Sequence, residues 1–407
     1  MKKVWDKWTR IALVKRILVG LILGAILGIA VPQATGIAIL GDVFVSALKA
    51  IAPLLVFFLV ISSLCNAGKS HGGVIKTVII LYMFSTVLAA VIAVFASMAF
   101  PVKMTLANAA TDTSAPQGIV EVLNNLLLNV VANPVSSLVN ANYVGILMWA
   151  VLLGLAFRVA DKMTKKVLAD VADGISMVVT WIINLAPFGI FGLVFNTVST
   201  NGLDIFTTYG KLLLLLVGCM LFIYFVTNPL LVYWCIRQNP YPLIFQCLKR
   251  SALTAFFTRS SAANIPVNMK VCEEMGLDRD TYSVTIPLGA TINMDGAAIT
   301  ITVMTMATAF TLGIHVDIPT AIILSLLAAL SACGASGVAG GSLLLIPMAC
   351  SLFGISDDIS MQVVAVGFII GVVQDSVETA LNSSSDLLLS ASAEFRQWRL
   401  EGKEIKY

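Results

Sequence analysis

Long apolar runs dominate this chain and restrict the kind of fold it can adopt. A helix that crosses a bilayer needs about 20 consecutive apolar residues, and runs of that length recur along the 407 residues. Only 12% of the residues are charged, whereas soluble globular domains carry about 25%. The sequence therefore predicts an all-α polytopic membrane protein. Eight transmembrane helices are expected, at residues 11–31, 43–65, 74–100, 119–157 (in several pieces), 172–199, 210–236, 280–313 and 358–390.

Two more apolar stretches, residues 242–272 and 319–353, are interrupted near their middles by small and polar residues. Lysine and arginine gather in alternate loops, and because basic loops face the cytoplasm, both termini are expected there. Eight spans already account for this alternation, so each interrupted stretch must enter and leave the bilayer on one side. We expect two re-entrant hairpins of opposite orientation. Inverted repeats with broken helices are typical of transporters that bind substrate near the bilayer midplane.

The cysteines and histidines do not indicate a metal or redox centre. Seven cysteines are scattered through apolar stretches without a CxxC pair, and the histidines, His71 and His315, lie far from one another in sequence. Buried free cysteines behave as small hydrophobic residues, and zinc sites use closely spaced ligands. We expect no disulfide, no structural zinc and no organic cofactor.

Residues 375–386 place polar side chains on one face of an otherwise apolar helix. Asp375, Glu378, Thr379, Asn382 and Asp386 follow one another at i, i+3, i+4, i+7 and i+11, which is one side of an α-helix. A carboxylate at the bilayer centre costs about 2.5–3.5 kcal/mol on insertion scales, and such residues usually mark ion or substrate pathways. This face is therefore the candidate functional site.

Small and polar residues mark three further points where helices are expected to break. Residues 258–261, Thr-Arg-Ser-Ser, form the tip of the first hairpin, and residues 333–342 at the second tip include four glycines. Helix N-termini at such tips offer free N–H groups to an anion, although a kinked spanning helix would also explain the first stretch. Residues 293–296, Asn-Met-Asp-Gly, supply side-chain and freed carbonyl oxygens that suit a monovalent cation. A capped helix break is the alternative.

These motifs, in this order, resemble those of the sodium:dicarboxylate and amino-acid symporters, the glutamate-transporter family. The resemblance covers essentially the whole chain and is strongest over residues 252–386. It implies an elevator fold, in which a transport unit moves against a scaffold, and a homotrimer. By this resemblance residues 1–236 are mainly scaffold, with the helix at about 74–100 joining the transport unit, residues 237–394 form the transport core, and residues 395–407 are a cytoplasmic tail.

The resemblance also implies particular sodium ligands. Three candidate sites are expected, the third the deepest in the protein, and the number of sodium ions stays open. Their expected ligands are Asp386, Gly289, Asn293 and Asn382 for the first, Thr291 with the backbone near Cys333 and Ala335 for the second, and Asp295, Asn293, Ser85 and Thr86 for the third.

The substrate, by the same resemblance, would lie between the two hairpin tips and the last spanning helix. Asp375 would receive its α-ammonium group, while Thr379 and Asn382 would line the pocket and hold its α-carboxylate. The expected substrate-binding set is Ser260, Ser261, Met294, Ser336, Gly337, Val338, Gly340, Asp375, Glu378, Thr379 and Asn382.

Glu378 departs from the pattern of the members that transport acidic amino acids. Those members carry at this position an arginine that binds the substrate's side-chain carboxylate, whereas a carboxylate here would repel one. Arg259, at the first tip, could still serve an acidic substrate or could pair with Glu378. We expect pairing of Arg259 with Glu378, because an unpaired buried carboxylate is costly.

The sequence therefore predicts a sodium-coupled symporter for small neutral amino acids, L-serine and L-threonine first, in a bacterial inner membrane. The alternative keeps the fold and changes the cargo to acidic amino acids or dicarboxylates, coupled to sodium or protons. A channel is a further alternative, but no filter or charge ring is evident. An intramembrane hydrolase would need a base near Ser260 or Ser261, and neither histidine lies in a suitable motif. We expect no enzymatic activity.

Overall fold

The computed structural model describes residues 11, 13–66, 73–106, 127–128, 130–203, 205–333, 335 and 340–405. Within these residues the regular secondary structure is helical throughout, with no β-strand. The described part contains six helices long and apolar enough to cross a membrane. These findings confirm the prediction of an all-α polytopic membrane protein. The six are Thr35–Ser62, Gly73–Ala99, Lys162–Asn184, Phe206–Ile236, Arg279–Thr311 and Asp357–Leu400.

The N-terminal part is a set of helices packed through glycines and broken at a proline. Helices α2 (Leu13–Ala30) and α9 (Ala186–Asn201) approach so closely that a Cβ atom on Gly20 would lie 2.2 Å from the carbonyl oxygen of Pro187. The expected span at 172–199 is two helices, because α8 (Lys162–Asn184) ends just before this proline. The expected run at 119–157 is in pieces as far as it is described, with α6 at Pro134–Val139 and α7 at Tyr143–Ala156. Helix α3 (Ile39–Asn66) packs against α7, α8 and α9.

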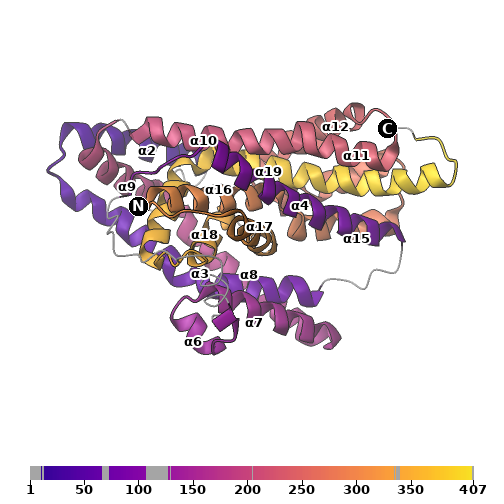
Figure 1. Cartoon of the computed structure of the whole chain (residues 1–407), viewed down its shortest axis with the longest axis horizontal. Coiled ribbons are helices and arrows are strands. Elements are labelled where there is room, and N and C mark those ends of the chain that lie inside the picture. The colour runs from indigo at the N-terminus through magenta and orange to yellow at the C-terminus, as the bar shows by residue number, and fades with distance from the viewer. Residues whose placement is uncertain are drawn as a thin grey trace.

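The C-terminal helix α19 (Asp357–Leu400) is the longest element and organises the rest of the molecule. Figure 1 shows it running along the long axis, with α10 (Ile205–Phe222) and α11 (Asn228–Ile236) packed beside it. A π-helical turn, Ile223–Thr227, joins α10 to α11. Helix α19 continues ten residues beyond the expected span, and Phe395 is fully buried. The segment expected to be a tail therefore begins as packed helix.

The first interrupted stretch folds into two helical legs that meet at a sharp turn. The first leg comprises α12 (Tyr241–Cys247), a π-helical turn (Leu248–Ala252) and α13 (Leu253–Thr258). The second leg is α14 (Ser261–Glu274), which contacts α13. The turn lies at Arg259, whose φ of 53° is in the left-handed region.

The second interrupted stretch has the same arrangement of two contacting legs. Its first leg is α17 (Ile318–Ala332), and its second is the 3₁₀ turn η5 (Gly341–Leu345) followed by α18 (Ile346–Ser351). Gly340, with φ 72°, begins the second leg. The two stretches are called hairpin 1 (241–274) and hairpin 2 (318–351) below.

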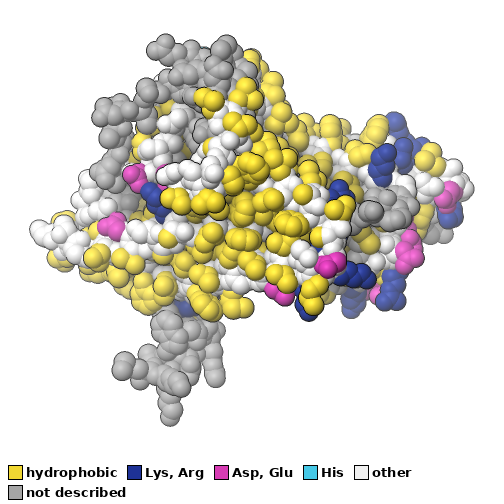
Figure 2. Space-filling view, turned by 90° about the horizontal axis from the view of Figure 1, so that it is seen from below, with side chains coloured by type: hydrophobic (Ala, Val, Ile, Leu, Met, Phe, Trp, Pro, Cys, Tyr) yellow, Lys and Arg dark blue, Asp and Glu magenta, His cyan; other side chains and the backbone are white. Residues whose placement is uncertain are grey.

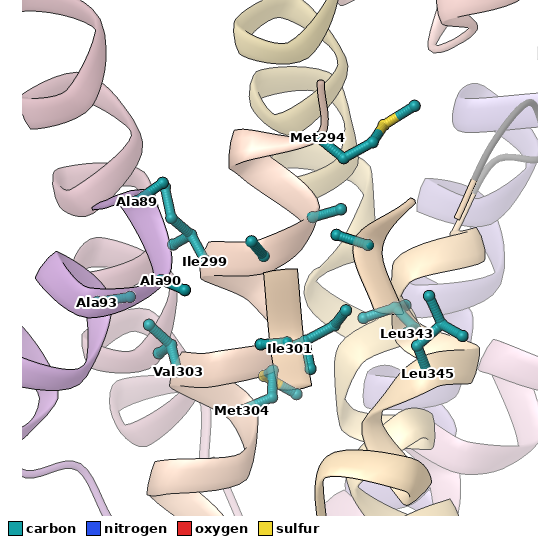
Figure 3. Close-up of a cluster of buried hydrophobic side chains, with 14 of the residues drawn as sticks. Ala89, Ala90, Ala93, Met294, Ile299, Ile301, Val303, Met304, Leu343 and Leu345 are labelled. Carbon is teal, nitrogen blue, oxygen red and sulfur yellow. The ribbon is translucent and has the colours of Figure 1, made fainter. Parts of the chain in front are cut away.

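The expected span at 280–313 is divided into α15 (Arg279–Ile292) and α16 (Asp295–Thr311) at Asn293–Met294. All residues of α16 from Asp295 to Ala309 are buried, because the helix is enclosed by α4 (Gly73–Ala99), α19 and hairpin 2. Figure 3 shows small side chains of α4 on one side of α16 and leucines of η5 on the other. The labelled side chains are Ala89, Ala90 and Ala93 of α4, Met294 at the break, Ile299, Ile301, Val303 and Met304 of α16, and Leu343 and Leu345 of η5.

Charged and apolar side chains are separated on the surface. Figure 2 shows a broad apolar surface along the molecule, with lysine and arginine gathered mainly at the end where α19 finishes. Exposed apolar side chains on spanning helices suit a lipid environment, and basic side chains at one end suit the cytoplasmic side of a membrane.

Candidate ion and substrate site

The polar face of α19 is buried within the protein. Asp375, Glu378, Thr379, Asn382 and Asp386 are each between 1% and 6% exposed. A single continuous helix carries all five, so the expected common face is present. It faces α16 and its preceding break, and both hairpins contribute side chains or backbone to it.

Asp386 lies against the break between α15 and α16. Its Oδ1 accepts a hydrogen bond of 2.9 Å from Nδ2 of Asn293. A Cβ atom on Gly289 would come within 2.8 Å of the same oxygen, so glycine is required for this approach. Oδ1 of Asn293 is buried and has no hydrogen-bond partner among the residues that the structure describes. A carboxylate beside an unpartnered amide oxygen is a donor set that fits a monovalent cation.

Asp295 meets the pair of hydroxyl residues on α4. Its Oδ2 accepts 2.7 Å from Ser85 Oγ, and its Oδ1 accepts 3.0 Å from Thr86 Oγ1. Thr86 in turn accepts from the backbone N–H of Met294 at 3.3 Å. The three side chains are fully buried. Three of the four residues expected to form the third sodium site are therefore brought together, while Nδ2 of the fourth, Asn293, binds Asp386.

Thr291 and Cys333 lie near the C-terminal end of α15. The Thr291 hydroxyl donates 2.7 Å to the carbonyl oxygen of Leu288 in its own helix. The Cys333 thiol, at the end of the first leg of hairpin 2, lies 3.7 Å from the carbonyl oxygen of Ile292. The carbonyl of Ala335 packs against Gly341, where a Cβ atom would be only 2.6 Å away. Hairpin 2 therefore touches the end of α15, as the expected second site requires.

Asn382 fixes the start of α16. Its Oδ1 accepts 2.7 Å from the backbone N–H of Gly296, and its Nδ2 lies 3.4 Å from Sδ of Met294. Thr379 occupies the preceding turn of the same buried face. Asn382 thus already binds part of the helix break that also contacts Asp386.

The expected pair of Arg259 with Glu378 is wrong. Arg259 binds Asp375 instead: its Nε and Nη2 both lie 2.6 Å from Oδ2 of Asp375. Nη2 also approaches the carbonyl oxygen of Gly371 at 3.5 Å. The left-handed turn at the tip of hairpin 1 brings the guanidinium to α19 one turn before Glu378. The carboxylate expected to receive an α-ammonium group is thus neutralised by the protein's own arginine.

Glu378 is bound by hydroxyl and amide donors, not by a basic side chain. Its Oε2 accepts 2.7 Å from Thr300 of α16 and 2.9 Å from Ser342 of hairpin 2, and it also accepts from Gln374. None of these three partners was predicted from the sequence. Gln374 could have been found, because it is four residues before Glu378 on the same helix face. Nothing in the sequence singled out Thr300.

The hairpin tips reach the site in different ways. In hairpin 1, Ser260 Oγ accepts 3.2 Å from the N–H of Ala263 and so caps α14, while Ser261 is buried. In hairpin 2, the N–H of Gly340 donates 3.2 Å to Oδ1 of Asp375. The expected substrate ligands Ser336, Gly337 and Val338 lie outside the described residues.

Two broken hairpins around buried carboxylates, in a helical membrane protein, are features of secondary transporters with a midplane site. The comparisons with known proteins agree. A model of the sodium:dicarboxylate symporter family matches residues 13–394. The chain is 57% identical over 406 residues to a protein named serine/threonine transporter SstT from Bifidobacterium adolescentis, with 100% of this chain and 94% of the relative covered.

Proteins with the same name from two strains of Streptococcus thermophilus are 55% and 56% identical over 400 residues, with 98% of this chain and 100% of each relative covered. The protein belongs to the sodium:dicarboxylate symporter family. The family and the relatives are named as transporters. This agrees with the expectation of no enzymatic activity but does not test it.

Proposed function

We propose that this protein is a sodium-coupled symporter that imports small neutral amino acids, with L-serine and L-threonine as substrates. The names of its relatives support this substrate class. Sodium would be the co-transported ion, held by the oxygens around Asp386 and Asn293 and by those around Asp295. The inward movement of one charge is worth about 2.3 kcal/mol per 100 mV, which can drive accumulation of a neutral solute.

The surroundings of Glu378 favour a neutral substrate over an acidic one. This buried carboxylate is bound by Thr300 and Ser342, and Arg259 is already bound to Asp375. A second carboxylate from an acidic substrate would meet like charge in a buried site, which costs several kcal/mol. The basic residue that could compensate is committed to another partner. A neutral side chain avoids this cost.

The substrate's α-ammonium group would bind Asp375 through Oδ1, which the N–H of Gly340 also approaches, while Arg259 keeps its contacts with Oδ2. Thr379 and Asn382 would hold the α-carboxylate, and the second tip, including Ser336 to Val338, would close over it.

The proposed transport cycle is elevator-like. Residues 237–394, joined by the helix at about 74–100, would move as one unit against a scaffold formed mainly by residues 1–236. The full topology would be eight spans and two re-entrant hairpins, with the basic end of the molecule and both termini in the cytoplasm of a bacterial cell. A homotrimer is proposed on the family resemblance alone.

Uptake into proteoliposomes tests the function. An inward sodium gradient is expected to drive accumulation of labelled L-serine, and unlabelled L-threonine in excess is expected to compete. Excess L-aspartate should have little effect, because of Glu378. Strong inhibition by aspartate, or uptake that persists with potassium in place of sodium, would contradict the proposal. Glu378→Arg is expected to increase the competition by aspartate, and unaltered serine uptake in this variant would remove Glu378 from the pocket.

A further inference from the structure

A large apolar groove lies outside the ion and substrate site, between α4 and α10. Its volume is about 850 Å³, within the range of ligand-binding pockets, about 300–1,000 Å³. Phe95 and Phe100 of the α4 side and Leu214 and Phe222 of α10 are 48–73% exposed along it. Exposed apolar side chains on spanning helices face lipid, so a groove of this volume between two such helices is open to acyl chains.

One basic side chain lies in this apolar lining. Lys211 is in the second turn of α10 and is exposed. Among the residues that the structure describes, no acidic side chain forms an ion pair with it. A lysine on a spanning helix extends its amine towards the membrane interface, where its natural counter-charge is a lipid phosphate.

The length of the groove matches one leaflet of a bilayer. The groove residues of α10 begin at Lys211 and end at Phe222, which corresponds to a length of about 16 Å along an α-helix. Half of the hydrocarbon core is about 15 Å thick. An acyl chain that runs from a phosphate at Lys211 towards the bilayer centre would therefore end near Phe222. The polar and apolar ends of the groove have the spacing of a phospholipid.

We propose that the groove binds a phospholipid of the surrounding bilayer, with one acyl chain between α4 and α10 and its phosphate at Lys211. Lys211 lies away from the end where α11 finishes and basic side chains gather, so the lipid would come from the opposite leaflet (Figure 1). A second copy of the chain is a poorer occupant, because it would bury the lysine against an apolar surface without a counter-charge.

The site could influence transport through the two helices that form it. Helix α4 carries Ser85 and Thr86, which bind Asp295, and the groove begins at Ile92, less than two turns further along. Helix α10 packs against α16 and α19. A lipid between these helices would support the elements that hold the ion site without touching it.

Gly218 offers a direct way to fill the groove. A Cβ atom there would meet no other atom within 4 Å, so a larger side chain can enter the groove without a clash. Gly210 is a matched control, since it lies on the same helix, also has nothing within 4 Å and does not line the groove. Gly218→Leu and Gly210→Leu each replace a glycine inside α10, so both variants gain the same helix propensity.

Native mass spectrometry of the purified full-length protein, with phosphatidylglycerol or phosphatidylcholine added, tests the proposal. The unaltered protein and Gly210→Leu are expected to retain one added lipid per chain through a wash in lipid-free detergent. Gly218→Leu is expected to lose it. Lys211→Gln is expected to retain less of either lipid, with the larger loss for the anionic phosphatidylglycerol.

Equal retention by Gly218→Leu and Gly210→Leu would overturn the proposal, as would a groove that holds no lipid in the unaltered protein. A change of oligomeric state in Gly218→Leu without loss of lipid would show that a second copy fills the groove, which also contradicts it.

Discussion

The two hairpins have the same overall plan but are attached to α19 by different chemistry. Hairpin 1 is attached to α19 by neutral amides and hydroxyls: Nδ2 of Asn264 donates 2.8 Å to Ser383 Oγ, and Nδ2 of Asn268 donates 2.8 Å to the carbonyl of Ser383. These groups are buried, and Nδ2 of Asn264 also donates 3.0 Å to Ser251 Oγ within hairpin 1. Apart from Arg259 at its tip, the attachment of hairpin 1 does not depend on what the site contains.

Hairpin 2 is attached through the carboxylates of the site itself. Ser342 donates to Glu378 and the N–H of Gly340 donates to Asp375. Any ligand that changes the charge or hydrogen bonding of these two carboxylates also changes the contacts of hairpin 2. We infer that hairpin 1 keeps its position while hairpin 2 responds when ligands occupy the site. Four substitutions are expected to separate the two hairpins.

The largest effect is expected at the proposed sodium site around Asp386 and Asn293. Asp386→Asn removes the charge beside Asn293 and should raise the sodium concentration needed for half-maximal serine uptake by about 10- to 100-fold, since contacts to charged groups are worth about 1.5–3 kcal/mol. Asp358→Asn is the control, because Asp358 is exposed and pairs with Lys49. Unchanged sodium dependence in Asp386→Asn would exclude this carboxylate from the ion site.

The second effect concerns the bond between Ser342 and Glu378. Ser342→Ala removes one donor to a buried carboxylate, so local opening of hairpin 2 should become about tenfold more frequent. Amide hydrogen exchange over residues 341–351 measures this opening. Ser325→Ala, whose hydroxyl bonds to its own helix at Ala321, should leave the exchange unaltered. Equal exchange in both variants would show that Glu378 does not hold hairpin 2.

A smaller effect is expected in hairpin 1. Ser383→Ala removes an acceptor of Asn264 and should lower the free energy of unfolding by about 1 kcal/mol, without changing the sodium dependence of uptake. Thermal unfolding in detergent measures the loss. Ser392→Ala is a matched control, because its buried hydroxyl bonds within its own helix to Leu388. A changed sodium dependence in Ser383→Ala would show that hairpin 1 also responds to the site.

The smallest effect is a pH dependence that distinguishes the helix caps of the two hairpins. Asp317 caps α17 by accepting 2.8 Å from the N–H of Thr320. Hydrogen bonds from the Thr320 hydroxyl and from its N–H lower the pKa of the Asp317 carboxyl below its ordinary value. A lowered pKa means that the cap stabilises α17 at neutral pH and is lost as the pH falls through that pKa. Ser260, which caps α14, does not titrate.

Amide exchange at Thr320 should therefore lose protection at low pH while exchange at Ala263 does not, after correction for intrinsic rates. Asp317→Asn should abolish the difference. Parallel loss of protection at both positions would indicate general acid unfolding and would remove the cap as its cause.

Helix faces and breaks were predictable from the sequence, because they depend on local spacing. The face from Asp375 to Asp386 follows from helical periodicity, and the break at Asn293–Met294 lies at a polar motif in an apolar run. The division of the expected span at 172–199 was missed, although Pro187 restricts the residue before it and disfavours a continuous helix there.

Side-chain partners across elements were less predictable. The meeting of Asp295 with Ser85 and Thr86 was expected from the family resemblance alone. The Arg259–Asp375 pair depends on a left-handed backbone turn and on the rotation of α19, and neither is encoded by spacing. Thr300 becomes a partner of Glu378 only because α16 packs with one particular face towards α19.

Amide hydrogen exchange of both hairpins, measured with and without sodium and L-serine, would show which hairpin responds to the contents of the site. Ligands are expected to increase protection over residues 341–351 of hairpin 2 and to leave residues 261–274 of hairpin 1 unchanged. Equal changes in both hairpins, or a change confined to hairpin 1, would contradict this expectation.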